Sequence, residues 1–314
     1  MKSLSIFLTG ATGVIGKRVL PLLLAEGHQV SAVGRSDEKR AALARAGARP
    51  VSIDLFDAAA VRRAVAGHDV VINLATAIPP MSRTFVPGAW RKTSQIRRAV
   101  SANLSAAILD AGGARMMIQE SFAPIYSDAG DRWIDETSPI RAVRYNRAVL
   151  DAEAAAERVT RAGGVGIALR FAYFYGPDSE FTLDAFRFIR KGRAPFLGHP
   201  TGYFSSLHHD DAATAVVAAL DLPAGRYNVA DDQPLTRRQL ADGIASALDV
   251  APPKFFPTWV SALAGSLGEL LSRSERISNR RLRQLGNWSP RYSNATIGMR
   301  SIVAERNWHE GVAA

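Results

Sequence analysis

Three glycines near the start of the chain have a spacing that suits a dinucleotide. Residues 9–16 read Thr-Gly-Ala-Thr-Gly-Val-Ile-Gly and follow the apolar run Leu4–Leu8. A glycine at every third position allows a tight turn, close approach of the backbone to a pyrophosphate, and close packing of a helix on a strand. The N–H groups at the start of the next helix then face an anion. We therefore predict a dinucleotide-binding turn made of Gly10, Ala11, Thr12, Gly13, Val14, Ile15 and Gly16.

The residues after the second expected strand distinguish between the two nicotinamide cofactors. Gln29–Val33 is apolar and strand-like, and Gly34, Arg35 and Ser36 follow it. An acidic side chain at this place would hydrogen-bond to a ribose 2′-OH, whereas an arginine suits a 2′-phosphate. Arg35 can pair with a phosphate through two N–H groups, and Ser36 can add a hydrogen bond. We predict a preference for NADP(H) over NAD(H); the alternative is that Arg35 is a solvated loop residue.

Strand and helix signals alternate through the first half of the chain, which predicts a Rossmann-type, doubly wound parallel sheet of the α/β class. We expect further strands at 51–55, 69–74, 115–119 and 166–171, and helices at 57–66, 90–111 and 144–161. The second half is richer in proline and aromatic residues, with a helix from residue 210 and a strand at 226–229. We predict a dinucleotide-binding domain of residues 1–176 and 205–225, and a smaller substrate-binding lobe of residues 177–204 and 226–314.

Composition excludes several classes of protein. The 314 residues contain no cysteine, which excludes disulfides, thiol catalysis and cysteine-ligated metals. The histidines do not follow a metal-ligand spacing, so we expect no metal site. Apolar runs stay shorter than the ~20 residues that cross a bilayer, and the N-terminus passes straight into the first strand without a signal peptide. We expect a cytoplasmic protein that binds no membrane.

The net charge of +10 raises the possibility of nucleic-acid binding. The arginines are scattered along the chain, however, and aromatic residues do not interleave with them as they do on single-strand-binding surfaces. Solvated helix faces are the simpler interpretation. We expect a small-molecule substrate and no nucleic acid, with an acidic ligand such as a phosphorylated cofactor as the next use of the charge.

With these segments placed, the chain resembles the extended short-chain dehydrogenase/reductase family, in its NAD-dependent epimerase/dehydratase group. The resemblance covers almost the whole length. It rests on 9–16, on Leu169–Pro177 as the family's sixth-strand signature, on the segment Leu207–Ala213 and on the strand 226–229. It implies that Asp54 and Leu55 contact the adenine and that Leu74, Ala75 and Thr76 line the cofactor. It also allows a homodimer, because family members often pair through the helices that correspond to 90–111 and 144–161.

The resemblance further implies a catalytic Ser or Thr and a Tyr-x-x-x-Lys pair, in which the lysine activates the tyrosine and holds the cofactor ribose. Tyr145 matches the tyrosine and would act as acid or base and contact the cofactor. The lysine position is Val149. A valine carries no charge and cannot hydrogen-bond to a ribose, so this chain departs from the family pattern. We expect activity that is slow or that rises toward alkaline pH.

The hydroxyl position is also changed. Counting back from Tyr126, the usual Ser or Thr falls on Phe122, and Ser121 is one residue away. Ser121 is our candidate for the catalytic hydroxyl. Glu120, an acidic residue at a strand end, is more often a structural hydrogen-bond acceptor than a base. Tyr173 occupies the place where sugar-nucleotide members commonly have asparagine, which makes a nucleotide-sugar substrate less expected.

Two functions remain open from these residues. The first is an NADP(H)-binding oxidoreductase, epimerase-like or reductase-like, acting on a carbonyl or hydroxyl substrate with Tyr145 as acid or base. The second is a non-catalytic NADP(H)-binding sensor or regulatory protein, which keeps the cofactor turn and lacks the reacting groups. The fold alone does not decide between them, because function depends on the site.

Overall fold

A seven-stranded sheet forms the centre of the molecule. The computed structural model describes residues 3–79, 83, 86, 88–111 and 115–305. All neighbouring strands of the sheet are parallel, in the order β11-β7-β5-β4-β1-β2-β3. The strands are β1 (Ser5–Thr9), β2 (Gln29–Val33), β3 (Arg49–Val51), β4 (Val70–Asn73), β5 (Met116–Phe122), β7 (Val165–Phe171) and β11 (Gly225–Val229). The chain reverses its direction across the sheet between β1 and β4, and ligands of such folds bind at that point.

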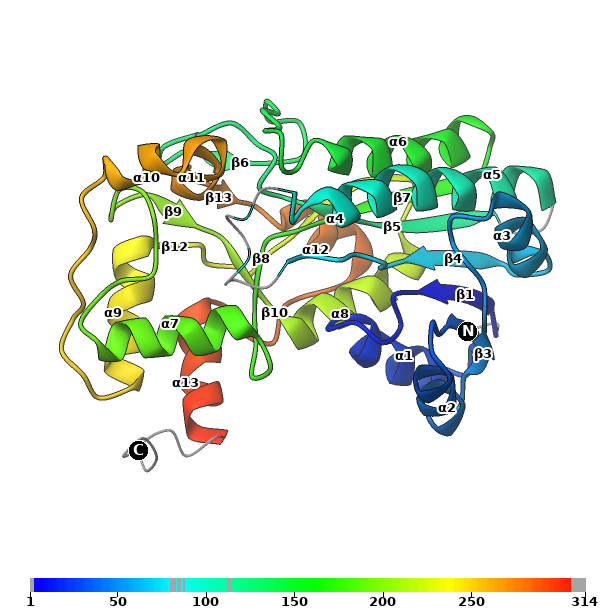
Figure 1. The fold of residues 1–314 in the computed structure, drawn as a ribbon, viewed down its shortest axis with the longest axis horizontal. Coiled ribbons are helices and arrows are strands. Elements are labelled where there is room, and N and C mark those ends of the chain that lie inside the picture. The colour runs from blue at the N-terminus through cyan, green and yellow to red at the C-terminus, as the bar shows by residue number, and fades with distance from the viewer. Residues whose placement is uncertain (1–2, 80–82, 84–85, 87, 112–114, 306–314) are drawn as a thin grey trace.

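Helices cover both faces of this sheet (Figure 1). One face packs against α1 (Gly16–Ala25), α2 (Asp37–Arg45) and α8 (His209–Ala218). The other packs against α3 (Ala58–Val65), α5 (Ser101–Ala111) and α6 (Ala148–Arg161). Strands that are covered on both faces are apolar without alternation, as the buried run Ile6–Leu8 shows. The expected α/β doubly wound fold is confirmed.

The expected helix 90–111 is built from three consecutive segments. These are α4 (Arg91–Gln95), a π-helical segment (Ile96–Val100) and α5. A π-helical segment inside a helix shifts the side chains that follow it and often marks a functional site. Arg97 lies in this segment and meets Glu120 of β5 at the carboxyl edge of the sheet.

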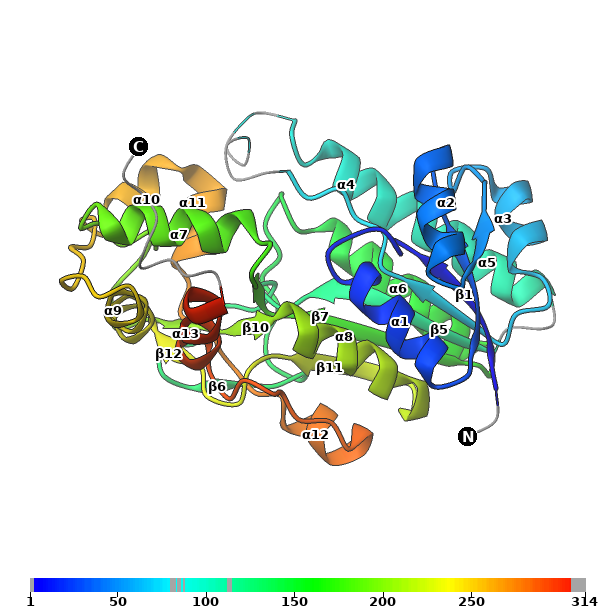
Figure 2. The same ribbon diagram turned by 90° about the horizontal axis from the view of Figure 1, so that it is seen from below.

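A smaller lobe lies beyond the carboxyl edge of the sheet, and Figures 1 and 2 place its helices together at the end of the molecule opposite α2 and α3. Its helices are α7 (Glu180–Arg190), α9 (Arg237–Ala247), α10 (Val260–Leu263), α11 (Gly265–Ser272) and α13 (Ala295–Glu305). Three short pairs of strands connect it to the sheet domain: β8 (Tyr173–Tyr175) with β10 (Ser206–His208), β9 (Tyr203–Phe204) with β12 (Leu235–Thr236), and β6 (Trp133–Ile134) with β13 (Arg276–Ile277). Helix α12 (Arg280–Gly286) packs beside β11, and a 3-10 turn (Ala219–Asp221) follows α8. The lobe has an apolar core of its own, which contains Phe186, Phe196, Leu240, Ile244 and Met299.

Several boundaries differ from the sequence-based expectation. The third strand ends at Val51, so 52–55 form the loop after it. Strand β5 continues to Phe122, three residues past the expected end, and its last residues reach the site. Strand β11 crosses the division that we expected after residue 225, because 226–229 pair with β7 in the main sheet. Helix α6 begins at Ala148, so residues 144–147 form a turn before the helix.

Candidate active site

One cavity of about 1260 Å³ joins the carboxyl edge of the sheet to the lobe. Most of the residues expected to bind the cofactor line it: Gly10, Thr12, Gly13, Val14, Ile15, Gly16, Arg35, Asp54, Leu55, Leu74, Ala75, Thr76 and Tyr145. Three expected site residues lie outside its wall, as far as the described residues show: Ala11, Ser36 and Ser121. The cofactor segments therefore come together as expected, whereas the expected catalytic pair does not.

The glycine turn fits a dinucleotide because side chains are excluded where the backbone must be open. Gly10 has a φ of +72°, and a Cβ atom there would lie 2.4 Å from the carbonyl oxygen of Leu74. A Cβ atom on Gly16 would lie 2.1 Å from the carbonyl oxygen of Gly10. Helix α1 begins here without a side-chain cap on its N-terminus. The N–H groups of Lys17, Arg18 and Val19 donate to backbone carbonyls of the turn. The N–H groups of Val14, Ile15 and Gly16 are therefore the ones placed to face an anion.

Buried side chains fix the strand ends beneath this turn. Asn73 accepts a hydrogen bond from Thr9 Oγ1 at 2.6 Å and donates to Gln119 Oε1 at 2.8 Å and Ser101 Oγ at 3.2 Å. These contacts join β1, β4, β5 and helix α5. A fully hydrogen-bonded buried network of this kind rigidifies the floor of the cavity.

Two basic residues line the cavity beside the end of β2. Arg35 was expected there, and Lys39 in the first turn of α2 was missed by sequence analysis. Ser36 is the N-cap of α2 and accepts the N–H of Lys39, so its hydroxyl has a structural role. The nearby acid Asp37 forms an ion pair with Arg40. This side of the cavity therefore presents the two cations Arg35 and Lys39. Asp37 is paired with Arg40 and is not part of the described cavity wall.

Tyr145 lies in the turn before α6, half-buried, and lines the cavity. Its ring contacts that of Trp90 edge to face, with centroids 6.1 Å apart. Asn146 holds the turn by accepting the N–H of Val143 at 2.8 Å and donating to the carbonyl of Pro124 at 2.7 Å. Val149 is fully buried in the first turn of α6. The position that carries the family's lysine is therefore occupied by core packing in this protein.

Ser121 is turned away from Tyr145. It is fully buried and donates to Glu153 Oε1 at 2.6 Å. Arg170 binds both oxygens of Glu153 at 2.7 Å and donates to the hydroxyl of Tyr126. Burial raises the pKa of Tyr126 to about 12, although the charge of Arg170 opposes this. Side chains alternate along a strand, so Ser121 projects to the other side from Glu120 and Phe122. The structure thus gives Ser121 a place in a buried network and does not bring it to the cavity.

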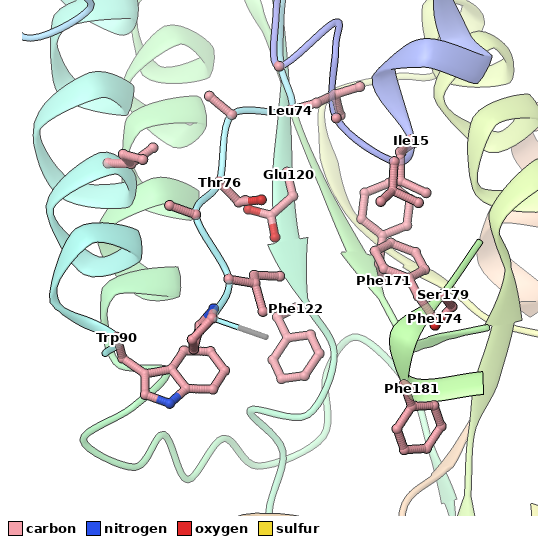
Figure 3. A pocket seen from close by; sticks show the side chains of 18 of the residues that line it. Ile15, Leu74, Thr76, Trp90, Glu120, Phe122, Phe171, Phe174, Ser179 and Phe181 are labelled. Atoms are coloured by element: carbon pink, nitrogen blue, oxygen red, sulfur yellow. The ribbon is translucent and has the colours of Figure 1, made fainter. Parts of the chain in front are cut away.

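Glu120 and Phe122 project from β5 into the cavity, between Thr76 and Trp90 on one side and Phe174 and Phe181 on the other (Figure 3). Phe122 lines the wall at the position that carries a hydroxyl in the family pattern. Glu120 pairs with Arg97, with Oε1 2.5 Å from Nη2 and Oε2 3.2 Å from Nε. Both side chains of this pair are almost completely buried. Sequence analysis considered Glu120 but missed Arg97, whose direction depends on the π-helical segment.

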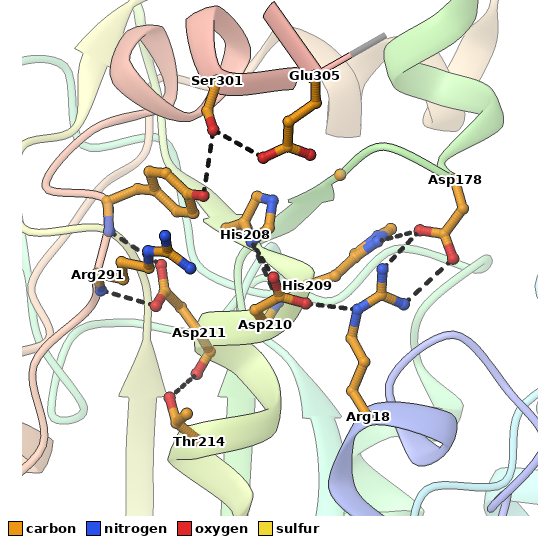
Figure 4. A network of polar contacts seen from close by, with 12 residues as sticks. Arg18, Asp178, His208, His209, Asp210, Asp211, Thr214, Arg291, Ser301 and Glu305 are labelled. Carbon is orange, nitrogen blue, oxygen red and sulfur yellow. Dashed lines mark hydrogen bonds and ion pairs between the residues drawn. The ribbon is translucent and has the colours of Figure 1, made fainter.

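A cluster of charges joins the sheet domain to the lobe next to the cavity (Figure 4). Arg18 of α1 binds Asp178 at 3.0 Å and Asp210 at 2.6 Å, and Lys17 also pairs with Asp178. Burial alone would raise the pKa of Asp178, but hydrogen bonds from Arg18 and Lys17 hold it well below its usual range. His209 lies 3.0 Å from Asp178, yet burial lowers the pKa of His209 to about 4. The histidine is therefore neutral near pH 7.

The described residues contain no group of three or more His, Cys, Asp or Glu placed to hold a metal ion. In the same part of the chain, no helix is long and apolar enough to cross a bilayer.

Comparison with known proteins agrees with this architecture. Residues 6–230 match the model of the NAD dependent epimerase/dehydratase family. A Streptomyces protein named 3-diazoavenalumate denitrifying reductase is 32% identical over 305 residues, which cover 94% of this chain and 98% of that protein.

Solved structures with low sequence identity share the fold. The human epimerase family protein SDR39U1, solved with NADPH, is 19% identical, with a TM-score of 0.75 and coverage of 96% of this chain and 99% of that one. A UDP-glucose 4-epimerase from Thermotoga maritima, solved with UDP-glucose, is 18% identical, with a TM-score of 0.75 and coverage of 96% and 98%. Structures of this fold have thus been solved with NADPH and with a sugar nucleotide. By its family match and its Streptomyces relative, the chain belongs to the NAD-dependent epimerase/dehydratase family of extended short-chain dehydrogenases/reductases.

Proposed function

We propose that this protein is an NADP(H)-dependent reductase of a small molecule. The observation that carries the proposal is that the glycine turn and Tyr145 line the same cavity, which continues into the lobe. A dinucleotide on the turn and a substrate in the lobe would thus meet beside Tyr145. When bound, the cofactor supplies the hydride. The remaining tasks of binding, orienting and moving a proton belong to residues of this chain.

The preference for NADP(H) is supported by the charges beside the end of β2. Arg35 and Lys39 line the cavity where the adenosine ribose is expected, and Asp37 is paired with Arg40. Two cations can hold a 2′-phosphate through charge-assisted hydrogen bonds. A ribose 2′-OH would lack the acidic partner that NAD-dependent relatives of this fold provide.

Tyr145 is our candidate for the proton donor or acceptor, because its side chain lines the cavity and a phenol can serve either role. Phe122 and Val149 replace the hydroxyl and the lysine that would assist it. A substrate that needs little proton transfer at the reacting atom suits this arrangement better than one that needs a strong acid.

Two kinds of hydride acceptor differ in whether they also need a proton. A carbonyl group takes up one hydride and one proton to become an alcohol. An aryl diazonium group takes up one hydride and releases N₂ to leave the arene, with no net proton. The Streptomyces relative, named for the denitrifying reduction of a diazo compound, makes the second type a candidate for this chain.

The proposal is tested by turnover with the purified full chain. NADPH consumption is followed with cinnamaldehyde as the carbonyl substrate and with 4-hydroxybenzenediazonium as the diazo substrate, against reactions without protein. We expect protein-dependent consumption with at least one of them, NADPH preferred over NADH, and release of N₂ in the diazonium reaction. Consumption that is equal with and without protein for both substrates contradicts the reductase proposal.

A non-catalytic NADP(H)-binding protein is the second candidate, favoured by Phe122 and Val149 at the two catalytic positions. It predicts tight NADPH binding without consumption by either substrate. Protein-dependent turnover excludes it. Unchanged turnover of the carbonyl substrate in the Tyr145→Phe variant removes Tyr145 as the proton donor; diazonium turnover takes up no proton and serves as the control for cofactor binding.

A further inference from the structure

The two halves of the cavity differ in charge. The cationic side chains of its described lining come from the sheet domain: Arg35, Lys39, Lys92 and Arg97. From residue 171 to residue 271, the charged lining residues are all carboxylates: Asp178, Glu180 and Asp184. His209 also lies in this half, and burial lowers its pKa to about 4, so it adds no charge near pH 7. The described wall of the lobe half therefore offers an anion no cationic side chain.

Four connected aromatic rings from residues 173–204 line the same half, and Phe122 at the end of β5 in the sheet domain adjoins them. Tyr173 stacks on Phe204, with centroids 4.5 Å apart and planes 13° apart. Phe122 meets Tyr173 edge to face at 5.5 Å, and Phe181 lies nearly parallel to Phe204 at 6.3 Å. Phe196 closes the group at 5.4 Å from Phe204. All five rings line the cavity, and Figure 3 shows Phe122 and Phe181 directed into it.

A nucleoside diphosphate fits this half poorly. Its phosphates need cations or free backbone N–H groups, and the charged side chains here are carboxylates. Lys17 and Arg18 pair with Asp178 and Asp210, and Arg187 pairs with Asp184. These three cations are balanced by three carboxylates and leave no excess positive charge for a ligand. A flat ring system instead gains contact area and offset or edge contacts with the aromatic wall.

We propose that the lobe half of the cavity binds a flat aromatic substrate that carries no phosphate. This rests on the proposed function, since the reacting group of that substrate would extend past Phe122 toward Tyr145 and the glycine turn. The aromatic wall would favour this class of substrate, and the absence of cationic side chains from the described lining of the lobe half would disfavour phosphorylated ones.

The test measures binding without requiring turnover. The full chain, with and without saturating NADPH, is titrated calorimetrically with cinnamaldehyde, 2-naphthaldehyde and UDP-glucose. We expect saturable binding of at least one aldehyde and at least tenfold weaker binding of UDP-glucose. UDP-glucose binding as tightly as the aldehydes, or no binding of either aldehyde, overturns the proposal.

Variants locate the binding on the wall. Phe181→Ala should weaken aldehyde binding about tenfold by removing one ring from the wall. Phe181→Leu, which keeps an apolar side chain, should weaken it less and serves if the alanine variant does not fold. The matched control is Trp133→Ala, because Trp133 is an exposed aromatic residue outside the described cavity wall. Equal affinities in the wild type and both Phe181 variants contradict the placement.

A charge variant tests the selection against anions. Glu180 is exposed at the start of α7 and lines the cavity. Glu180→Lys should strengthen binding of the anion cinnamate several-fold relative to binding of the neutral cinnamaldehyde. Unchanged cinnamate binding contradicts the electrostatic part of the proposal.

The wild-type titrations separate this inference from the proposed function. If the wild type binds an aldehyde but not NADPH, the proposed function alone is wrong. If it binds NADPH but neither aldehyde, this inference alone is wrong.

Discussion

Glu120 Oε1 lies 2.5 Å from Arg97 Nη2, and both side chains line the cavity at the carboxyl end of β5. Glu120 lies two residues before Phe122, which takes the place of the family's catalytic hydroxyl. Phe122 and Val149 thus occupy the two positions where a hydroxyl and a lysine act in relatives that keep the pattern. The remaining polar group of the pattern is Tyr145, and its neighbours determine what chemistry it can assist.

Breaking this pair should destabilise the protein. Glu120→Gln removes the negative charge and leaves Arg97 buried without a counter-ion, so we expect the free energy of unfolding to fall by about 3 kcal/mol. Chemical denaturation at pH 7 measures it. Asp151→Asn is the matched control, because it removes a carboxylate from the exposed pair with Arg98 and should cost less than about 1 kcal/mol. Equal losses of unfolding free energy in both variants would show that the buried pair stabilises the protein no more than the exposed pair does.

Restoring the family's lysine should harm this chain. Val149 is fully buried, so Val149→Lys places a charge in the core, and we expect a loss of about 2–4 kcal/mol in the free energy of unfolding. Val149→Ala is the control for lost packing without charge. A lysine variant of normal stability with faster turnover would instead show that the site still accommodates the family's pair.

Removing either cation beside β2 should affect one cofactor selectively. Arg35→Ala and Lys39→Ala should each weaken NADPH binding about tenfold, which corresponds to one lost charge-assisted contact with the 2′-phosphate. NADH binding should change little, because NADH lacks that phosphate. Fluorescence titration of both cofactors measures the difference. Arg40→Ala is the control, since Arg40 is paired with Asp37 and lies outside the described cavity wall.

Ser121→Ala should affect stability and spare activity. The variant removes the hydrogen bond to Glu153, so we expect a loss of about 1 kcal/mol in the free energy of unfolding. Because Ser121 does not reach the cavity wall, kcat should stay near that of the wild type. A large drop in kcat at unchanged stability would return Ser121 to the catalytic role expected from the sequence.

The titration of His209 should destabilise the protein as the pH drops from 6.5 toward 4. Burial lowers the pKa of His209 from 6.5 to about 4, so the unfolded chain binds a proton in this range that the folded chain does not. Unfolding therefore becomes more favourable by up to about 3 kcal/mol. Burial also lowers the pKa of His208, which adds to the loss in the same direction.

The contribution of Asp178 has a different range. Its lowered pKa gives stability that is present above its ordinary pKa of 3.8 and is lost below that value.

The His209 prediction is tested by urea denaturation between pH 4 and 7. The wild type is compared with His209→Gln, in which the titration of His209 is absent. The free energy of unfolding of the wild type should fall relative to that of the variant as the pH drops, and a difference that does not change with pH would contradict the role of His209.

The sequence by itself determined the fold class and the cofactor half of the site. The spacing of Gly10, Gly13 and Gly16 after a buried strand depends on local geometry, because the turn must exclude Cβ atoms wherever it is found. The strand and helix pattern was equally local. Its errors include boundaries, such as the end of the third strand at Val51 and the start of α6 at Ala148, and helix α2, which was not predicted. The charge of Arg35 and the replacement of the family's lysine by Val149 could also be identified from the sequence, because each depends on the residue type at one position.

The tertiary structure decided which side chains meet. Ser121 and Glu120 are neighbours in sequence, but the alternation along β5 and the position of Glu153 turn Ser121 into a buried network and leave Glu120 in the cavity. Arg97 reaches Glu120 because of a π-helical segment that no local pattern marked. The aromatic wall joins Phe122 to rings more than fifty residues away, and contacts between distant segments depend on how the whole chain packs.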